Sequence, residues 1–96
     1  MPVLLSGTFT ADGNSPRITF PGGAGTVQAD GTFGSGTLSL EVSSDGGTTF
    51  TNGGTSVQLT AEGLFNFTLP SDELIVRLAL SGSTSPDIDW WVSANA

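Results

Sequence analysis

Few side chains in this sequence could support catalysis. It contains nine Asp and Glu residues but no His, Cys or Lys. A serine nucleophile commonly depends on a His or Lys base, so acyl transfer of that kind is disfavoured. Paired carboxylates can hydrolyse glycosides, and Asp87 and Asp89 would share one face of a strand. Because we expect no deep cleft to raise a carboxyl pKa, we interpret both as solvated acids and predict that the protein is not an enzyme.

Motifs for metals and modification are weak. Without His or Cys, the usual zinc sites cannot form. Two acidic glycine turns, Asp12-Gly13-Asn14 and Asp45-Gly46-Gly47, could offer oxygen ligands to calcium, but neither matches an EF-hand loop and turn formation alone accounts for both. Asn66-Phe67-Thr68 matches the glycosylation sequon, yet it falls within an expected strand and no secretion signal is seen, which favours chance. We expect no cofactor and no metal.

The charge balance restricts the partners. The net charge is −7, and Arg17 and Arg77 are the only bases. Phosphate backbones and anionic membranes are bound by clusters of Lys and Arg, so neither nucleic acid nor membrane is expected as a partner. No apolar run is long enough to span a bilayer, and residues 1–7 lack the positive segment of a signal peptide. The sequence therefore indicates a soluble protein made in the cytoplasm, which a basic patch on a partner would attract.

Short strand-like segments alternate with glycine-rich turns along the chain. In residues 37–43, Leu38, Leu40 and Val42 occupy one face, which is the period of two of a half-buried strand. The expected strands cover residues 3–10, 17–20, 26–33, 37–43, 48–51, 56–61, 64–69, 73–80 and 87–93. Eight or nine strands of this length predict one all-β domain over residues 1–96, an antiparallel β-sandwich that is either a jelly roll or immunoglobulin-like. Because the turns are short, strands adjacent in sequence are expected to pair.

The last expected strand carries an aromatic candidate for binding. Trp90 and Trp91 are adjacent, so their side chains point to opposite faces of the sheet. Trp90 belongs to the apolar face, which leaves Trp91 on the outer face beside Asp87 and Asp89. Trp91 could form a contact surface, since aromatic residues are enriched at binding hot spots, or lie beneath a loop or a terminus.

The strand expected at residues 73–80 is apolar on both faces. Ile75 accompanies Arg77 on the face opposite the main apolar set. Such a strand is either central and covered or part of an interface. We expect Arg77 to pair with Asp89 or with Glu41.

The N-terminal segment contains Val3, Leu4 and Leu5, and no strong turn sequence lies beside it. We therefore predict that residues 1–6 form a docking arm, whose removal would weaken attachment more than folding. Together with the strands expected at residues 73–80 and 87–93, this arm gives a candidate interface. Its members are Val3, Leu4, Leu5, Ile75, Arg77 and Trp91.

Two segments resemble those of a known group of proteins. Residues 38–50 (LSLEVSSDGGTTF) and 59–67 (LTAEGLFNF) resemble paired hairpins of small virion proteins of tailed bacteriophages, and RLALSG at 77–82 and WWV at 90–92 fit the same pattern. The resemblance begins at Thr37 and covers the rest of the chain. It implies a structural component of a phage particle, commonly a trimeric capsid decoration (cement) protein on the capsid surface, and it brings no catalytic residues.

The leading hypothesis is a decoration protein that bridges neighbouring subunits of the major capsid protein. A carbohydrate-binding β-sandwich module is the first alternative, in which Trp91 would stack on a sugar. A tail or head–tail adaptor subunit, which would form rings, is the second. Additional stability from a homo-oligomer would suit a small domain without disulfides, and a trimer is favoured by the resemblance.

Overall fold

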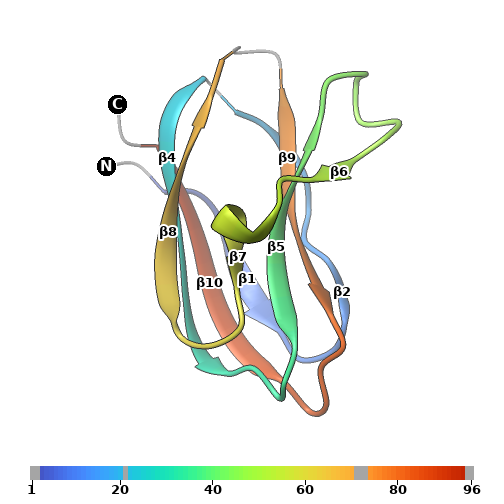
Figure 1. The fold of residues 1–96 in the computed structure, drawn as a ribbon, viewed down its shortest axis with the longest axis vertical. Helices are drawn as coiled ribbons and strands as arrows, with labels where there is room; N and C mark the ends of the chain where they lie inside the picture. Colours follow the sequence, from blue (N-terminus) through green and yellow to red (C-terminus); the bar gives the residue numbers. More distant parts are fainter. Residues whose placement is uncertain (1–2, 21, 71–73, 95–96) are drawn as a thin grey trace.

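The computed structural model describes residues 3–20, 22–70 and 74–94, which form two antiparallel β-sheets packed face to face (Figure 1). Sheet A has four strands in the order β1–β10–β4–β8. Their bounds are Val3–Phe9 for β1, Asp87–Ala94 for β10, Gly23–Thr32 for β4 and Gly63–Leu69 for β8. The predicted all-β antiparallel sandwich is confirmed.

Sheet B is built around two long strands and four short ones. The long neighbours are β9 (Ile75–Ser81) and β5 (Thr37–Ser43). The two-residue strands β2 (Gly13–Asn14) and β3 (Ile18–Thr19) pair with the free side of β9, while β6 (Thr51–Asn52) and β7 (Gln58–Leu59) pair with the free side of β5. A 3-10 turn, η1 (Thr55–Val57), precedes β7. Both long strands are therefore central in their sheet.

The strand order corresponds to the jelly-roll alternative. If β2 with β3, and β6 with β7, each count as one interrupted strand, the chain has eight strands in two sheets of four. The first then pairs with the last, the second with the seventh, the third with the sixth and the fourth with the fifth. This is a long doubled ribbon rolled into two sheets, which is the jelly-roll arrangement of a β-sandwich.

The expected pairing of sequence neighbours is mostly wrong. Among the described strands, β5 pairs with the nearby β6 and β7, but β4 and β5 lie in different sheets although only residues 33–36 separate them. Stacked sheets are about 10 Å apart, a gap that a few extended residues can cross. A short connection therefore does not distinguish a hairpin from a crossing between sheets.

Two of the expected strands are much shorter than predicted. Of residues 48–51 only Thr51 lies in a strand, and residues 55–57 form η1 before the two-residue β7. The Asp45 turn is not a tight hairpin but part of a loop over residues 44–50, which joins β5 to β6. Residues 60–62 link β7 of sheet B to β8 of sheet A, so the segment 59–67, which resembles a hairpin in sequence, does not close one. Residues 71–73, where one turn and the start of a strand were predicted, lie outside the described residues.

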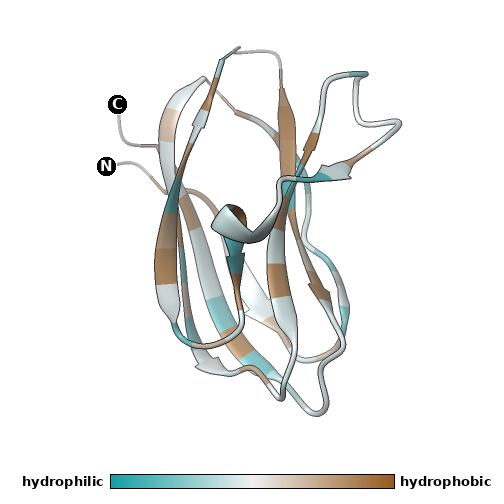
Figure 2. Ribbon diagram, viewed as in Figure 1, coloured by the Kyte–Doolittle hydropathy of each residue, from teal (hydrophilic) through white to brown (hydrophobic). Residues whose placement is uncertain are grey.

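The core lies between the sheets and follows the predicted alternation. Hydrophobic residues recur at intervals along the strands of both sheets (Figure 2). The largest fully buried apolar side chains are those of Phe20, Val27, Leu38, Leu40, Val76, Leu78, Ile88 and Val92. Two aromatic pairs extend this core: Phe20 with Phe67, at 5.0 Å between ring centroids, and Phe9 with Trp90, at 5.9 Å. The predicted inward direction of Trp90 is confirmed, and Trp91 therefore faces outward.

Candidate functional site

The outer face of sheet A presents Trp91 near its centre. The strand register aligns Ser6 of β1, Trp91 of β10, Gln28 of β4 and Leu64 of β8 across the four strands. Trp91 is half-buried and has a strand on either side. We call this surface the Trp91 face and define it by Val3, Gln28, Asp30, Leu64, Asp89 and Trp91. Four hydrogen-bonded strands hold these side chains in fixed positions.

Two exposed apolar side chains lie at the edges of the Trp91 face. In the described part of the chain, the large hydrophobic residues most open to solvent are Val3, which is 56% exposed, and Leu64, which is 58% exposed. Val3 belongs to the edge strand β1 and Leu64 to the opposite edge strand β8, with Trp91 between them. Apolar and aromatic groups placed on one rigid surface are typical of a contact site.

The polar groups of the Trp91 face are acidic or neutral. Asp89 and Asp30 are direct cross-strand partners. The hydroxyl of Thr8 donates a hydrogen bond of 2.8 Å to Oδ1 of Asp89, and Glu62, just beyond the face, accepts one of 3.3 Å from the backbone N–H of Gly31. Two like charges directly opposite each other are unfavourable.

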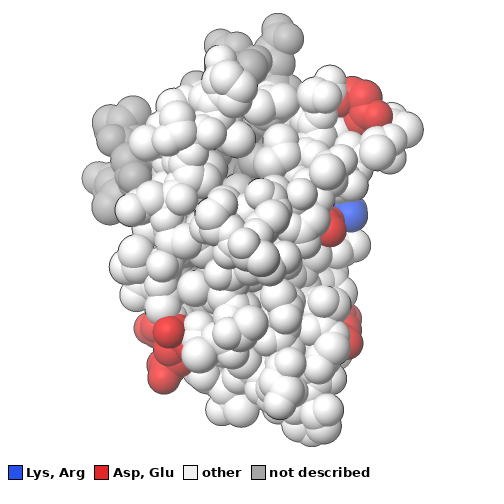
Figure 3. All heavy atoms as spheres, viewed as in Figure 1, with Lys and Arg blue, Asp and Glu red and all other residues white. Residues whose placement is uncertain are grey.

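The bases lie elsewhere. Nη1 of Arg17 donates a hydrogen bond of 2.9 Å to the carbonyl oxygen of Gly47, which joins two segments attached to sheet B. On the side of the molecule drawn in Figure 3, acidic atoms lie at the margins, and basic atoms are visible at one place, beside an acid. Neither arginine therefore neutralises the acids of the Trp91 face.

Ile75 and Arg77 lie on the outer face of sheet B, on the opposite side of the sandwich from Trp91. Nε of Arg77 is 2.7 Å from Oε1 of Glu41, so Glu41 is the partner among the two acids expected from the sequence. The Arg77 guanidinium also lies over the ring of Phe50, at 4.0 Å from the centroid. The sequence did not indicate the role of Phe50, because this residue comes from the irregular 44–50 loop. The guanidinium of Arg77 is therefore bound by two groups of its own chain, Glu41 and Phe50.

Val3, Leu4 and Leu5 belong to β1 and pair with β10 as part of sheet A. Val3 lies opposite Ser93, and Leu5 lies opposite Val92, with a bulge between them. Leu4 and Leu5 pack partly buried against the core, whereas Val3 is open to solvent. Met1 and Pro2 lie outside the described residues. The structure thus brings Val3 and Trp91 onto one sheet and separates them from Ile75 and Arg77.

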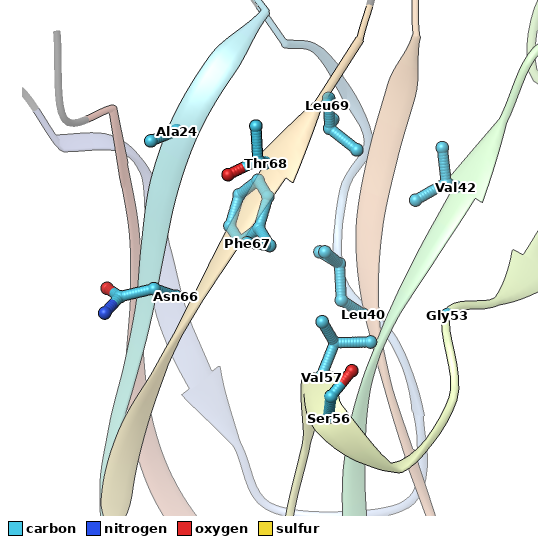
Figure 4. A pocket seen from close by; sticks show the side chains of 10 residues that line it. All are labelled: Ala24, Leu40, Val42, Gly53, Ser56, Val57, Asn66, Phe67, Thr68 and Leu69. Carbon is cyan, nitrogen blue, oxygen red and sulfur yellow. The ribbon is translucent and has the colours of Figure 1, made fainter.

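A cavity of about 420 Å³ opens between the sheets on the side of β8 (Figure 4). Its apolar lining comes from β5, β8, η1 and the start of β4, and Asn66 lies on the far side of β8. The lining residues are Ala24, Leu40, Val42, Gly53, Ser56, Val57, Asn66, Phe67, Thr68 and Leu69. None of them titrates, so the cavity has no acid or base for catalysis. The sequence analysis expected no deep cleft and did not predict this cavity, which lies beside the short strands β6 and β7.

The two acidic turns are explained by hydrogen bonds within the chain. The Ser43 hydroxyl donates a bond of 2.6 Å to Asp45, and the N–H of Thr49 donates one of 2.9 Å to the same carboxylate. These bonds lower the pKa of Asp45 to about 2, with the Ser43 hydroxyl as the largest cause. The hydroxyl and the backbone N–H of Ser83 lower the pKa of Asp12 in the same way.

The remaining motifs also have local explanations. Asn66 is exposed on the outer face of β8, where its side-chain oxygen accepts a bond of 2.7 Å from the Thr26 hydroxyl. Across the residues that the structure describes, no group of three or more His, Cys, Asp or Glu side chains could hold a metal ion. Nor does a helix in that part of the chain have the length and hydropathy to cross a membrane.

Comparison with known proteins gives no relative. No family model matches the chain, and neither a curated protein nor a solved structure is significantly similar to it. A functional proposal therefore rests on the residues of this chain and on the resemblance of residues 38–50 and 59–67.

Proposed function

We propose that this protein is a non-enzymatic structural protein of a tailed-phage virion, a capsid decoration (cement) protein that binds the major capsid protein. It bridges neighbouring capsid subunits through the Trp91 face. The observation that carries the proposal is that Val3, Trp91 and Leu64 all lie on the outer face of sheet A. The proposal also includes synthesis in the host cytoplasm, a final position on the capsid surface and a homo-oligomeric state, with a trimer favoured.

The assignment to a phage particle rests on the sequence resemblance of residues 38–50 and 59–67, although the second segment does not form a hairpin. Residues 38–50 form β5 and the following loop, whose Ser43 and Asp45 hydrogen bonds hold its shape. Residues 59–67 instead connect the two sheets. Because one fold hosts many functions, the jelly roll itself does not select this role.

Quantitative mass spectrometry of purified virions from the phage that encodes the chain tests this proposal. We expect a copy number comparable with that of the major capsid protein. The variant Trp91→Ser should leave particles largely undecorated, and Ile75→Ser, on sheet B, should decorate them normally. Absence from particles, or only a handful of copies, would reject the proposal. Loss of decoration in Ile75→Ser alone would move the attachment surface to sheet B.

Carbohydrate binding is the second candidate, because Trp91 is half-buried on a flat face directly opposite Gln28. An indole ring beside amide and carboxylate groups suits stacking on a sugar with hydrogen bonds at its rim. A glycan array followed by titration of tryptophan fluorescence tests this candidate. Binding that is lost in Trp91→Ala and is insensitive to salt would favour it over capsid attachment.

A tail or head–tail adaptor is the third candidate. It differs from a decoration protein in the size of its assembly. Adaptors form rings, whereas decoration proteins are commonly trimers. The mass of the assembly in solution, measured by light scattering, separates the two. A ring of six or more subunits would favour the adaptor.

A further inference from the structure

We infer that the Trp91 face binds a basic protein surface, with an Arg or Lys side chain of the partner placed against Trp91 and between Asp89 and Asp30. The inference rests on the proposed function in one respect, since it takes the Trp91 face as the attachment surface. It adds the chemistry of the partner.

The strand register provides the geometry of this site. Asp89 and Asp30 are opposite each other, and Trp91 and Gln28 form the next outward pair along the same two strands. Directly opposite Cβ atoms are about 5 Å apart, and successive residues on one face of a strand are about 7 Å apart. A cation held between the two carboxylates is therefore within reach of the Trp91 ring, since cation–π contacts extend to about 6 Å from the centroid.

The chain already contains this combination of groups at another place. Arg77 meets a carboxylate oxygen of Glu41 at 2.7 Å and the ring of Phe50 at 4.0 Å. On sheet B one guanidinium thus satisfies an acid and an aromatic ring together. The outer face of sheet A presents Asp30, Asp89 and, further along β10, Asp87 beside the ring of Trp91, and the described residues supply no base to these acids.

The unfavourable Asp30–Asp89 pair gives the partner a reason to be basic. The hydroxyl of Thr8 satisfies one oxygen of Asp89, but it does not neutralise either charge. A partner cation would remove the repulsion between the two carboxylates. Trp91 and Leu64 lie one outward position along the strands from this pair and would cover one side of the ion pair. Val3, opposite Ser93, lies beyond Trp91 and would contact the partner away from the acids.

A second copy of this chain does not fit the Trp91 face. In a two-fold contact the same surface is used on both subunits, so Asp30 and Asp89 would meet a surface that offers acids and no base. A head-to-tail contact would have Arg17 as its one base outside an ion pair among the described residues, since Arg77 is paired with Glu41, and a single guanidinium does not balance the acids of the face. The net charge of −7 adds a general repulsion between copies. The occupant is therefore a different, basic protein.

Fluorescence anisotropy with labelled synthetic peptides tests the inference. The probes are an octapeptide of alternating Arg and Thr and the same peptide with citrulline, the neutral isostere of Arg. At low ionic strength we expect the Arg peptide to bind at least about tenfold more tightly than the citrulline peptide. Raising the salt to about 0.3 M should largely abolish the difference, because exposed charges are then screened within several ångströms.

Variants then locate the bound cation. Asp30→Asn combined with Asp89→Asn should weaken the Arg peptide about tenfold, since each exposed ion pair contributes up to about fivefold in affinity. The control Asp12→Asn combined with Asp45→Asn removes the same charge away from this face and should leave the affinity within about twofold. Trp91→Leu, which keeps an apolar side chain but loses the ring, should weaken binding severalfold. Circular dichroism at the assay temperature verifies that each variant is folded.

The outcomes separate this inference from the proposed function. Equal binding of the Arg and citrulline peptides, or equal losses in the two double variants, would overturn the inference. So would normal decoration of virions by the Asp30→Asn and Asp89→Asn double variant, and the proposed function would then survive. If the protein is absent from virions but the Arg peptide binds as described, the proposed function fails and the basic partner belongs to another assembly.

Discussion

At the scale of single residues, Gly25 shows how tightly the core is packed. A Cβ at this position would lie 2.5 Å from Cζ of Phe67, 2.7 Å from Cζ of Phe20 and 2.9 Å from the backbone oxygen of Ser93. Overpacking of a core costs about 1–3 kcal/mol. We therefore expect Gly25→Ala to lower the free energy of unfolding by about 2 kcal/mol, measured by denaturant titration.

Gly63 provides the matched control for Gly25. It lies in the neighbouring strand of the same sheet, and a Cβ there would meet only Cδ2 of Leu59, at 3.6 Å, which is an ordinary contact. Gly63→Ala should therefore change stability by less than about 0.5 kcal/mol. Similar losses in both variants would contradict the explanation by steric overlap.

Asp45 gives a prediction about pH. Its pKa in the folded protein is lowered from 3.8 to about 2, chiefly by the Ser43 hydroxyl. A lowered folded-state pKa contributes stability above the unfolded-state pKa, and this contribution is lost as the pH falls through the folded value. The difference in Tm between the protein and Asp45→Asn should therefore narrow as the pH falls from about 5 to about 2. A difference that stays constant over this range would show that the carboxylate charge is not involved.

The outward direction of Trp91 could be predicted because alternation along a strand is a local property. The partner of Arg77 could be narrowed only to Asp89 or Glu41, because the choice depends on which strand lies beside β9. Once β5 occupies that position, Glu41 is directly opposite Arg77. Phe50 could not be predicted, since no periodicity extends into the loop that places it.

At the scale of elements, β1 links the predicted docking arm to folding. Residues 3–6 pair with β10, and Leu4 and Leu5 contact the core. Deletion of residues 1–6 should therefore lower Tm by several degrees as well as weaken attachment, measured by thermal denaturation and virion binding. The substitution Val3→Ser is the sharper test of docking, because it keeps β1 paired and changes an exposed side chain. Full attachment of Val3→Ser would argue against a docking role for this end.

Arg77, Glu41 and Phe50 tie the 44–50 loop to sheet B. The side chains of Arg77 and Glu41 are 27% and 20% exposed, so solvent screens their interaction only in part. We expect a coupling of about 1 kcal/mol in a double-mutant cycle of Arg77→Met and Glu41→Gln. In the control cycle Arg17→Met replaces Arg77→Met, and its coupling with Glu41→Gln should be near zero, because Arg17 donates to a backbone carbonyl and not to Glu41. A coupling near zero would mean that the ring of Phe50 alone holds the guanidinium.

Strand predictions succeeded along the long strands and failed between β5 and β8, although residues 56–61 also alternate. The bounds predicted for β5 are those observed, and β8 and β10 each differ from prediction by one residue at one end. In region 48–51, hydrogen bonds of Ser43 and Asp45, and not a strand ladder, determine much of the conformation. Region 56–61 alternates polar and apolar residues, but only its Gln58–Leu59 segment pairs as a strand. Pairing could not be derived because turn length does not report the sheet to which the next strand belongs.

At the scale of the whole molecule, the sandwich is open along one side. The cavity lies between β8, an edge strand of sheet A, and the short strands that flank β5 in sheet B. Backbone amides at an edge beside a cavity open more readily than those of central strands. Hydrogen exchange should therefore be slowest in β10, β4, β9 and β5 and clearly faster in β8, as measured by NMR in dilute protein.

The concentration dependence of this exchange bears on the proposed homo-oligomer. A subunit packed along β8 would cover its free edge and the mouth of the cavity, so β8 amides would gain protection as the protein concentration rises. The acidic Trp91 face would remain free for a basic partner, because it lies on the outer side of sheet A. If the β8 amides are as protected as those of β10 in the dilute monomer, the chain itself covers this edge and no neighbouring subunit is needed to protect it. If protection instead increases with concentration on the outer strands of sheet B, self-association uses that side, and the cavity stays accessible in the assembly.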